Sequence, residues 1–311
     1  MDNNKPVPGG VWSAAPTPLD IDMKVHAGDV RRMLDHHLRL GIDGLFLAGT
    51  NGEGPWLPDR EKSVLVRTVT DHVGGRLPIA VQVTDNSAAR IADNMTRAAD
   101  DGADIAVIAP PSFFMNATAD TLKHHYIDAI DTSPLPVGIY DRGSFGAVTV
   151  PLETLEEVYR HPKVVLVKDS STMDDHATAS LAARSERPEL TLLNGDEFDC
   201  ARYLERGYDG LLLGGGVFNG HIARLIFDAA RSGDMEKAGE WQKLMNDIMY
   251  TVYGGRDISC WLSGEKYLLV RLGIITTSRN FPRYPLHREC MDEIDRMLAQ
   301  NRDLLLPDNG G

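Results

Sequence analysis

The stretch Val164-Val165-Leu166-Val167-Lys168-Asp169-Ser170 decides how the rest of the chain is interpreted. Its four consecutive branched apolar residues predict a strand that is buried on both faces, as strands of parallel sheets are. Similar short apolar runs recur along the chain, and each is followed by a segment whose apolar residues have the spacing of a helix. They predict eight strands, at residues 10–15, 44–48, 78–83, 104–109, 136–140, 164–167, 190–193 and 210–213. Successive strands begin about 20 to 35 residues apart, which is the length of a βα unit.

Eight alternating strand and helix units predict an α/β fold, a (β/α)8 TIM barrel over residues 6–232. A doubly wound sheet is the alternative, but it normally carries a glycine-rich phosphate-binding turn after its first strand, and Pro16-Thr17-Pro18 is not one. Strand patterns stop after Gly233, and three apolar helical patterns follow. We therefore expect a C-terminal helical extension at 233–306, packed on the barrel, and a frayed tail at 307–311.

Composition narrows the classes of partner. The 311 residues carry a formal charge of −13, which argues against nucleic acid, because phosphate binding needs a net basic surface. Three widely spaced cysteines, Cys200, Cys260 and Cys290, argue against a disulfide framework and favour a reducing compartment. The N-terminus has no apolar signal region, and no apolar run is long enough to cross a membrane. We expect a cytoplasmic protein.

Lys168 follows the 164–167 strand, at the point where the chain should leave the core. Burial disfavours the charged ammonium, so a lysine in this place can offer a neutral amine. Such an amine attacks carbonyl carbon to form a Schiff base, which is how lysine acts as a covalent catalyst. The alternative is a structural lysine that extends past the strand end to pair with Asp169. The segment alone leaves the two interpretations about equally open.

The ends of the other strands help to decide, because the carboxyl ends of barrel strands form the active-site face. Residues 49–54 read Gly49-Thr50-Asn51-Gly52-Glu53-Gly54. Glycines allow a tight turn with exposed amide donors, an anion nest suited to a carboxylate, and Thr50 and Asn51 add side-chain donors. A plain glycine turn is the alternative. We assign Gly49, Asn51 and Gly52 to substrate binding and Thr50 to catalysis.

Tyr140 ends the fifth predicted strand. A tyrosine that points into the barrel mouth can move protons beside an imine carbon, although a single tyrosine is more often a core residue with a satisfied hydroxyl. The remaining predicted binding residues also lie beside strand ends: Arg142, Asp196, Gly214 and Gly215. The glycines at 214–216 suit either a phosphate nest or clearance around a ligand.

Together these positions predict a Schiff-base enzyme that acts on a 2-oxo acid. Lys168 would attack the keto carbon, the nest would hold the carboxylate and Tyr140 would move protons. We expect no cofactor beyond the covalent imine on Lys168. We also expect no metal, because His36-His37 and His124-His125 lack the spacing of metal-binding motifs.

The chain resembles the dihydrodipicolinate synthase / N-acetylneuraminate lyase family of pyruvate-dependent class I aldolases. The resemblance rests on Gly49-Thr50-Asn51-Gly52-Glu53, on Tyr140, and on Lys168-Asp169-Ser170-Ser171, and it covers roughly residues 8–300 in element order. It implies a barrel with C-terminal helices, a homotetramer built as a dimer of dimers, and neither a metal nor an organic cofactor.

Three departures from the family pattern bear on the substrate. Asn51 replaces the second hydroxyl residue of the nest, and Phe113 lies where the resemblance implies a tyrosine of a proton relay across subunits. Phe145 lies near the place of an arginine that binds the aldehyde's carboxylate, and Arg142 is close in sequence but need not point the same way. These departures favour a lyase that takes a 2-oxo acid and an aldehyde, and within that class a 2-keto-3-deoxy sugar acid aldolase. The alternatives are dihydrodipicolinate synthase, acting on pyruvate and aspartate semialdehyde, a catalytically silent 2-oxo-acid-binding barrel and, weakest, a metal-dependent aldolase.

Overall fold

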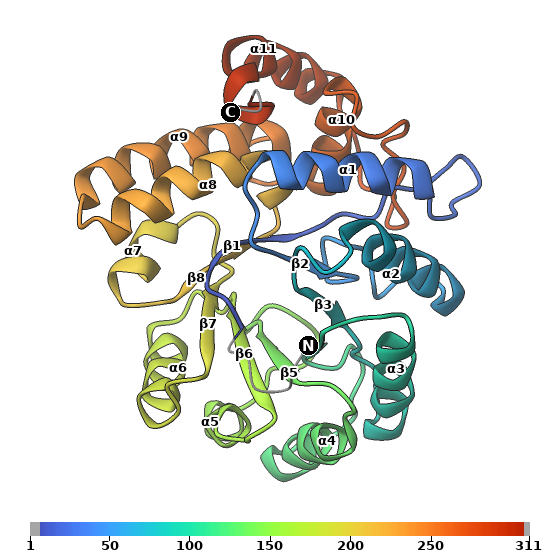
Figure 1. The fold of residues 1–311 in the computed structure, drawn as a ribbon, viewed down its shortest axis with the longest axis vertical. Helices are drawn as coiled ribbons and strands as arrows, with labels where there is room; N and C mark the ends of the chain where they lie inside the picture. Colours follow the sequence, from blue (N-terminus) through green and yellow to red (C-terminus); the bar gives the residue numbers. More distant parts are fainter. Residues whose placement is uncertain (1–6, 308–311) are drawn as a thin grey trace.

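Eight parallel strands form a closed barrel in the computed structural model, which describes residues 7–307 (Figure 1). Each strand pairs with the next along the chain, and β1 (Gly10–Ala14) closes the ring against β8 (Gly210–Leu213). The strands between them are β2 (Gly44–Leu47), β3 (Ile79–Gln82), β4 (Ile105–Ile108), β5 (Val137–Asp141), β6 (Val164–Asp169) and β7 (Thr191–Asn194). The predicted barrel is confirmed. The one difference that matters for the site is that β6 continues through Lys168 and Asp169.

A ring of helices surrounds the barrel (Figure 1). They are α1 (Ala27–Arg39), α2 (Asp59–Val73), α3 (Ala88–Asp100), α4 (Ala119–Thr132), α5 (Leu152–Tyr159), α6 (Asp174–Glu186), α7 (Cys200–Glu205) and α8 (Gly216–Arg231). Local sequence fixes where they begin. The Thr118 hydroxyl, for example, accepts a hydrogen bond from the Thr121 amide (3.2 Å) while Thr121 bonds back to the Thr118 amide, which is a capping box.

Two apolar cores result from the alternation of side chains along each strand. The larger core lies between the strands and the surrounding helices. The smaller one includes Trp12, Phe46, Leu166 and Tyr140 and fills the barrel interior. Tyr140 therefore belongs to the inward-facing set, and its strand neighbour Asp141 faces the helices. This alternation decides which residues at the strand ends reach the barrel mouth.

The C-terminal extension consists of α9 (Met235–Tyr253), α10 (Trp261–Arg271) and α11 (Arg288–Leu305). In Figure 1, α9 runs beside α8, and α10 and α11 lie at the top of the view, packed against α9 on its outer side. The predicted division near residue 232 falls in the turn between α8 and α9. Residue 6 and most of the predicted frayed tail, 308–311, lie outside the described residues.

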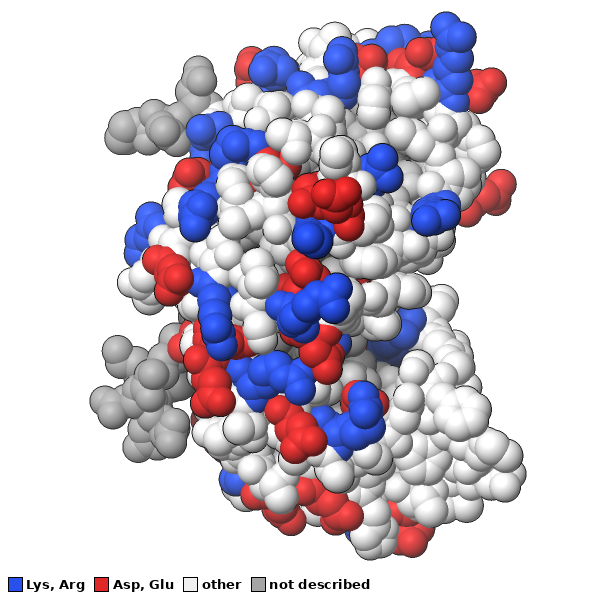
Figure 2. Space-filling view, turned by 90° about the vertical axis from the view of Figure 1, so that its right-hand side faces the viewer, with Lys and Arg blue, Asp and Glu red and all other residues white. Residues whose placement is uncertain are grey.

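Two general properties of the described chain bear on partners. Figure 2 shows lysine and arginine interspersed with aspartate and glutamate over one face, without a continuous basic surface there. No helix within residues 7–307 is both long and apolar enough to span a bilayer.

Candidate active site

Tyr140 and Lys168 are register partners on β5 and β6. The Lys168 Nζ atom lies 4.0 Å from the centroid of the Tyr140 ring and 5.4 Å from that of Phe46. Only 5% of Lys168 and 7% of Tyr140 are exposed. The predicted amine and phenol are therefore adjacent inside the mouth of the barrel, where solvent has little access.

Asp169 lies on the other side of β6. Its Oδ1 atom accepts hydrogen bonds from the Ser171 amide (2.9 Å) and hydroxyl (2.7 Å), and its Oδ2 atom accepts one from the Tyr208 hydroxyl (2.5 Å). Burial raises the pKa of this carboxyl, although these hydrogen bonds oppose the shift. The hypothesis that Lys168 extends to pair with Asp169 is wrong, because successive side chains of a strand point to opposite faces.

The electrostatic surroundings of Tyr140 favour its ionised form. Burial, the largest single influence, would raise the pKa of the phenol. The positive charges of Lys168 and Arg142, together with contributions from Thr50 and Lys168 as hydrogen-bond partners, outweigh burial and lower the pKa overall. Tyr140 is thus suited to give up and regain a proton next to an amine.

The turn after β2 presents its backbone to the barrel mouth. Among the described residues, the amides of Glu53 and Gly54 donate to Thr50 and Gly49, while no protein acceptor is recorded for the amides of Thr50 and Asn51. Gly52 is packed so closely that a Cβ atom would lie 2.8 Å from the Ala48 nitrogen. Two adjacent free amides can bind a carboxylate, as the anion-nest hypothesis requires.

The side chain of Asn51 is directed away from this role. Its Nδ2 atom donates toward the carbonyl oxygens of Ala14 (3.0 Å) and Gly214 (3.0 Å) and toward Oε1 of Glu265 (2.9 Å). Asn51 therefore joins the end of β1 and the turns after β2 and β8 to the buried Glu265 of α10. Its predicted contribution to substrate binding is left to its backbone amide.

Glu53, the last residue of the motif, is also occupied by structure. It forms a fully buried ion pair with Lys266 of α10, and its Oε2 atom accepts a hydrogen bond from the Phe281 amide (2.7 Å). Lys266 also donates to the carbonyl oxygens of Thr17 (2.7 Å) and Arg279 (2.8 Å). The C-terminal extension thus fixes the turn that carries the nest.

Glu197, on the loop after β7, is a functional candidate that the sequence analysis missed. Its carboxylate accepts hydrogen bonds from the Gly215 amide (2.7 Å) and the Tyr253 hydroxyl (2.9 Å). Burial raises the pKa of Glu197, against an opposing influence from Lys168. The predicted residue Asp196 instead completes the loop: its amide donates to Oδ1 of Asn194 (2.8 Å), and its own Oδ1 accepts from the Phe198 amide (3.2 Å).

The predicted glycines at the end of β8 support these neighbours. Gly214 accepts the Asn51 hydrogen bond, and Gly215 donates to Glu197. A Cβ atom on Gly215 would lie 3.1 Å from the Tyr253 hydroxyl, so clearance is needed here. The Gly215 amide is occupied by a carboxylate of the protein itself, which does not favour the phosphate-nest alternative at this position.

A cavity of 360 Å³ is lined mainly by the loops after β2, β3, β4 and β5, and neither Tyr140 nor Lys168 is among its lining residues. Two of the predicted residues, Thr50 and Arg142, line it, and both also lower the pKa of Tyr140, so they connect the cavity to the Tyr140 phenol. The Arg142 guanidinium carbon lies 5.9 Å from the Tyr140 ring centroid. The Arg142 guanidinium forms no ion pair with a carboxylate among the described residues. Arg90, another lining residue, is paired with Asp85 (2.7 Å).

Within residues 7–307 no group of three or more His, Cys, Asp or Glu side chains is placed to hold a metal ion. His36 and His37 are buried in α1, and burial lowers the pKa of His36 to about 4 and that of His37 to about 3. The prediction that the protein uses no metal stays a prediction.

Sequence patterns could not find several of the residues that complete the site. Phe46, Glu197, Tyr253 and Glu265 come from four separated segments, and none belongs to a motif that announces a role. Glu197 gave the only usable signal, because it follows the end of a predicted strand, next to the chosen Asp196.

Comparisons with known proteins identify the family of the chain. Residues 7–301 match the family model described as the dihydrodipicolinate synthetase family. A 4-hydroxy-tetrahydrodipicolinate synthase of Xanthomonas axonopodis pv. citri is 30% identical over 291 residues, covering 93% of each chain. The dihydrodipicolinate synthase structure from Bacteroides thetaiotaomicron is 26% identical, covers 95% of this chain and 99% of its own, and superposes with a TM-score of 0.86.

The structure of CdNal from Clostridium difficile, in complex with mannosamine, has the same fold. It is 20% identical, covers 94% of this chain and 98% of its own, and superposes with a TM-score of 0.84. The family match spans nearly the whole chain, including both the barrel and the C-terminal helices. The protein therefore belongs to the dihydrodipicolinate synthetase family.

Proposed function

We propose that this protein is a class I lyase that forms a Schiff base between Lys168 and a 2-oxo acid. The observation that carries the proposal is the adjacency of the buried Lys168 amine to Tyr140, with Nζ 4.0 Å from the ring centroid. An amine needs a nearby acid and base to form and hydrolyse an imine, because water must be expelled from and later returned to the same carbon.

The proposed reaction follows from these groups. The neutral Lys168 amine adds to the keto carbon, and the carbinolamine loses water to give a protonated imine. Cleavage of the bond between C3 and C4 releases an aldehyde and leaves its electron pair in an enamine. Proton transfer to C3, then addition of water to the imine carbon, releases the shortened 2-oxo acid and restores the amine. Tyr140 moves the protons, and the amides of Thr50 and Asn51 hold the carboxylate.

For the 2-oxo acid that is cleaved we propose a 2-keto-3-deoxy sugar acid, which gives pyruvate and an aldehyde. The polar cavity that Thr50 and Arg142 share with the surroundings of Tyr140 supports this choice, because Thr50, Gln82, Thr84, Asn86 and Arg142 can all meet hydroxyl or carboxylate oxygens. The curated relatives named 4-hydroxy-tetrahydrodipicolinate synthase support the alternative, condensation of pyruvate with aspartate semialdehyde. The alternative that is not an enzyme is a binding protein, which forms the imine with a 2-oxo acid but does not turn it over.

A panel of reactions tests these choices. Pyruvate is offered with glyceraldehyde, with aspartate semialdehyde or with no aldehyde, and product formation is followed by mass spectrometry. We expect turnover with glyceraldehyde, none in Lys168→Ala and full turnover in Lys163→Ala, a control lysine that precedes β6 and contacts the Asp131 and Ser133 carbonyls. If pyruvate gives product with aspartate semialdehyde but not with glyceraldehyde, the result would favour the synthase. If no aldehyde of a wide panel gives product, the result would favour the binding protein. Activity that persists after chelation is expected, since we propose no metal or other cofactor.

We also propose a homotetramer, built as a dimer of dimers, in the cytoplasm. Loops after β4 and β5 support association, because Phe113 is 65%, Met115 73% and Phe145 55% exposed. One structural relative is described as a monomeric dihydrodipicolinate synthase variant, so relatives of this fold differ in assembly. Three cysteines that are free and buried support a reducing location. Sedimentation velocity tests the assembly: a single species of four chains is expected, and a monomer at micromolar concentration would contradict it.

A further inference from the structure

Directly behind the Tyr140–Lys168 pair lies a second pair of neighbouring residues, which face the helices. Asp141 and Asp169 are also register partners, one position further along β5 and β6. Both are almost completely buried, with 2% and 1% of their surface exposed. Two carboxylates at neighbouring positions repel one another unless donors or positive charge compensate them.

Three groups contact the carboxylate of Asp141. The Tyr159 hydroxyl of α5 donates to Oδ2 (2.7 Å), Nδ1 of His176 on α6 contacts the same oxygen (2.7 Å), and the Gly143 amide donates to Oδ1 (2.9 Å). His176 is 5% exposed. Asp141 thus ties the end of the strand that carries Tyr140 to the two helices outside it.

The bond to Gly143 shapes the turn that carries Arg142. Gly143 has a φ of +51°, and a Cβ atom there would lie 2.9 Å from Cβ of Ser171, so its packing requires glycine. Ser171 is in turn bound to Asp169. The turns after Tyr140 and Lys168 are therefore packed against one another, and Asp141 fixes the first of them.

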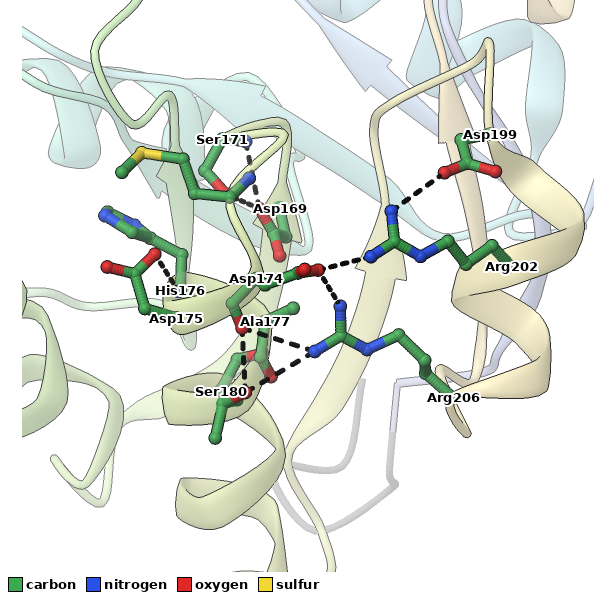
Figure 3. Close-up of polar contacts among 12 residues, drawn as sticks. Asp169, Ser171, Asp174, Asp175, His176, Ala177, Ser180, Asp199, Arg202 and Arg206 are labelled. Carbon is green, nitrogen blue, oxygen red and sulfur yellow. Dashed lines mark hydrogen bonds and ion pairs between the residues drawn. The ribbon is translucent and has the colours of Figure 1, made fainter.

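The first turn of α6 is anchored where it presents His176. Figure 3 shows that Asp174 faces two arginines, Arg202 within α7 and Arg206 directly after it. Its Oδ1 atom accepts hydrogen bonds from Arg202 (2.5 Å) and Arg206 (2.6 Å). The His176 amide donates to Oδ1 of Asp175 (2.9 Å). A histidine on an anchored helix end can define the position of the carboxylate that it contacts.

The groups that face His176 come from several elements. Asp141, Asp175 and Asp169 raise its pKa, with the hydrogen bond to Asp141 as the largest cause and burial opposing it. The phenols of Tyr159 and Tyr126 also lie within the electrostatic influence of Asp141, and Tyr208 contacts Asp169. In this group of acids and phenols His176 is the basic side chain, and the raised pKa favours its protonated form.

We propose that His176, acting through Asp141, is a positioning residue for the reaction: it holds the turn after β5 so that Tyr140 stays against Lys168 and Arg142 stays at the cavity. The proposal rests on the proposed Schiff-base function for its kinetic consequences, although the geometry that it describes does not. Because His176 does not touch the nest, it should affect the proton-transfer steps rather than affinity for the 2-oxo acid. Loss of its proton removes a positive charge beside Asp141, leaves its remaining hydrogen bonds from Tyr159 and Gly143, and should weaken this hold.

The kinetic test compares His176→Gln and Asp141→Asn with the control His161→Gln. His161 also forms a histidine–aspartate contact, with Asp131 (3.1 Å), but it precedes β6 at the opposite end of the strand. We expect kcat of both test variants to fall about tenfold or more, with KM for the 2-oxo acid within about twofold of the unmodified protein. The unmodified protein should lose kcat as pH rises through the titration of His176, and His176→Gln should lack that limb.

A second readout does not depend on turnover. Tyrosine labelled with ¹³C at Cζ reports the titration of each phenol by NMR, and Tyr140→Phe identifies the signal of Tyr140. If His176 positions the turn, the Tyr140 titration moves to higher pH in His176→Gln and Asp141→Asn, because Lys168 and Arg142 are no longer held near the phenol, and it stays unchanged in His161→Gln. Tyr159→Phe, which removes another donor to Asp141 and keeps the ring, substitutes for any variant that does not fold.

The outcomes separate this proposal from the proposed function. Unchanged kcat, pH profile and Tyr140 titration in both test variants would overturn the positioning role. So would a change confined to KM or to thermal stability. If the unmodified protein forms no imine but the Tyr140 titration still moves, the positioning role stands and the Schiff-base function fails.

Discussion

Glu53 and Lys266 form an ion pair in which neither side chain has any exposed surface. It joins the turn that carries the nest, after β2, to α10 in the C-terminal extension. The extension therefore supports the turn after β2 on the catalytic face, in addition to covering the outer surface of the barrel. The mutual attraction of two buried charges offsets the cost of removing them from water, whereas either charge alone would remain buried without that compensation.

Removal of one partner of this pair should be strongly destabilising. We expect Lys266→Met to lower the free energy of unfolding by about 3–5 kcal/mol, because the Glu53 carboxylate would remain buried without its counter-charge. The double variant Glu53→Gln with Lys266→Met should recover part of that loss. Urea unfolding of the two single variants and the double variant measures the coupling. Additive effects would mean that the pair contributes no specific interaction.

Tyr140→Phe should remove the proton transfer without disturbing the fold. We expect kcat to fall by about 10²–10⁴-fold, the usual contribution of a positioned acid or base. Tyr126→Phe is the matched control, because Tyr126 is also fully buried and its hydroxyl has no recorded partner among the described residues. Stopped-flow measurement of imine formation gives the rate directly. Equal rates in the two variants would exclude Tyr140 from the chemistry.

Arg142→Met tests how the cavity recognises the aldehyde, or the corresponding distal part of a sugar acid. Arg142 lines the cavity beyond Tyr140, so its loss should raise KM for a sugar acid or aldehyde that carries a distal anionic group. Its effect on a neutral aldehyde such as glyceraldehyde should be smaller, and trapping of the pyruvate imine should persist. Arg90→Met is the control within the same cavity, because Arg90 is already paired with Asp85. Equal effects of the two variants on KM would show that Arg142 acts only through the overall positive charge of the cavity and not through a specific contact with the substrate.

Acid should destabilise the protein through His36 and His37. Burial lowers the pKa of His37 to about 3, so this ring folds in its neutral form. Its stabilising contribution is complete above the unfolded pKa near 6.5 and is lost as pH falls toward the folded value, at up to about 1.4 kcal/mol per pH unit for each such histidine. Urea unfolding between pH 7 and pH 5 should show this loss, and His37→Gln should show less of it. His72→Gln, which alters a histidine paired with Asp35, is the control and should leave the slope unchanged.

The sequence was sufficient for the barrel and for the central pair of the site. A lysine and a tyrosine at the ends of adjacent strands must meet in a barrel mouth, because the strands are parallel and in register. What the sequence could not supply was which side chains the strand neighbours of this pair contact, such as Tyr159, His176 and Tyr208. Asp141 and Asp169 differ from Tyr140 and Lys168 by one position, yet they belong to the helix layer, as strand alternation requires.

Long-range contacts account for the rest. Glu265 and Lys266 reach the nest from a helix more than two hundred residues away along the chain, and no local pattern distinguishes them from other charges of α10. Asn51 was assigned to substrate because of its place in the motif, and only the structure shows its amide turned toward Ala14 and Gly214.

The central claim is that Lys168 carries the imine, and the most direct measurement is reductive trapping. The protein is incubated with pyruvate and borohydride, digested, and analysed by mass spectrometry for the mass added to each lysine, with Lys168→Ala and Lys163→Ala alongside. We predict a reduced pyruvate adduct on the peptide that contains Lys168, absent in Lys168→Ala and retained in Lys163→Ala. If neither pyruvate nor other 2-oxo acids leave an adduct on Lys168, its place beside Tyr140 is structural and the proposed chemistry is wrong.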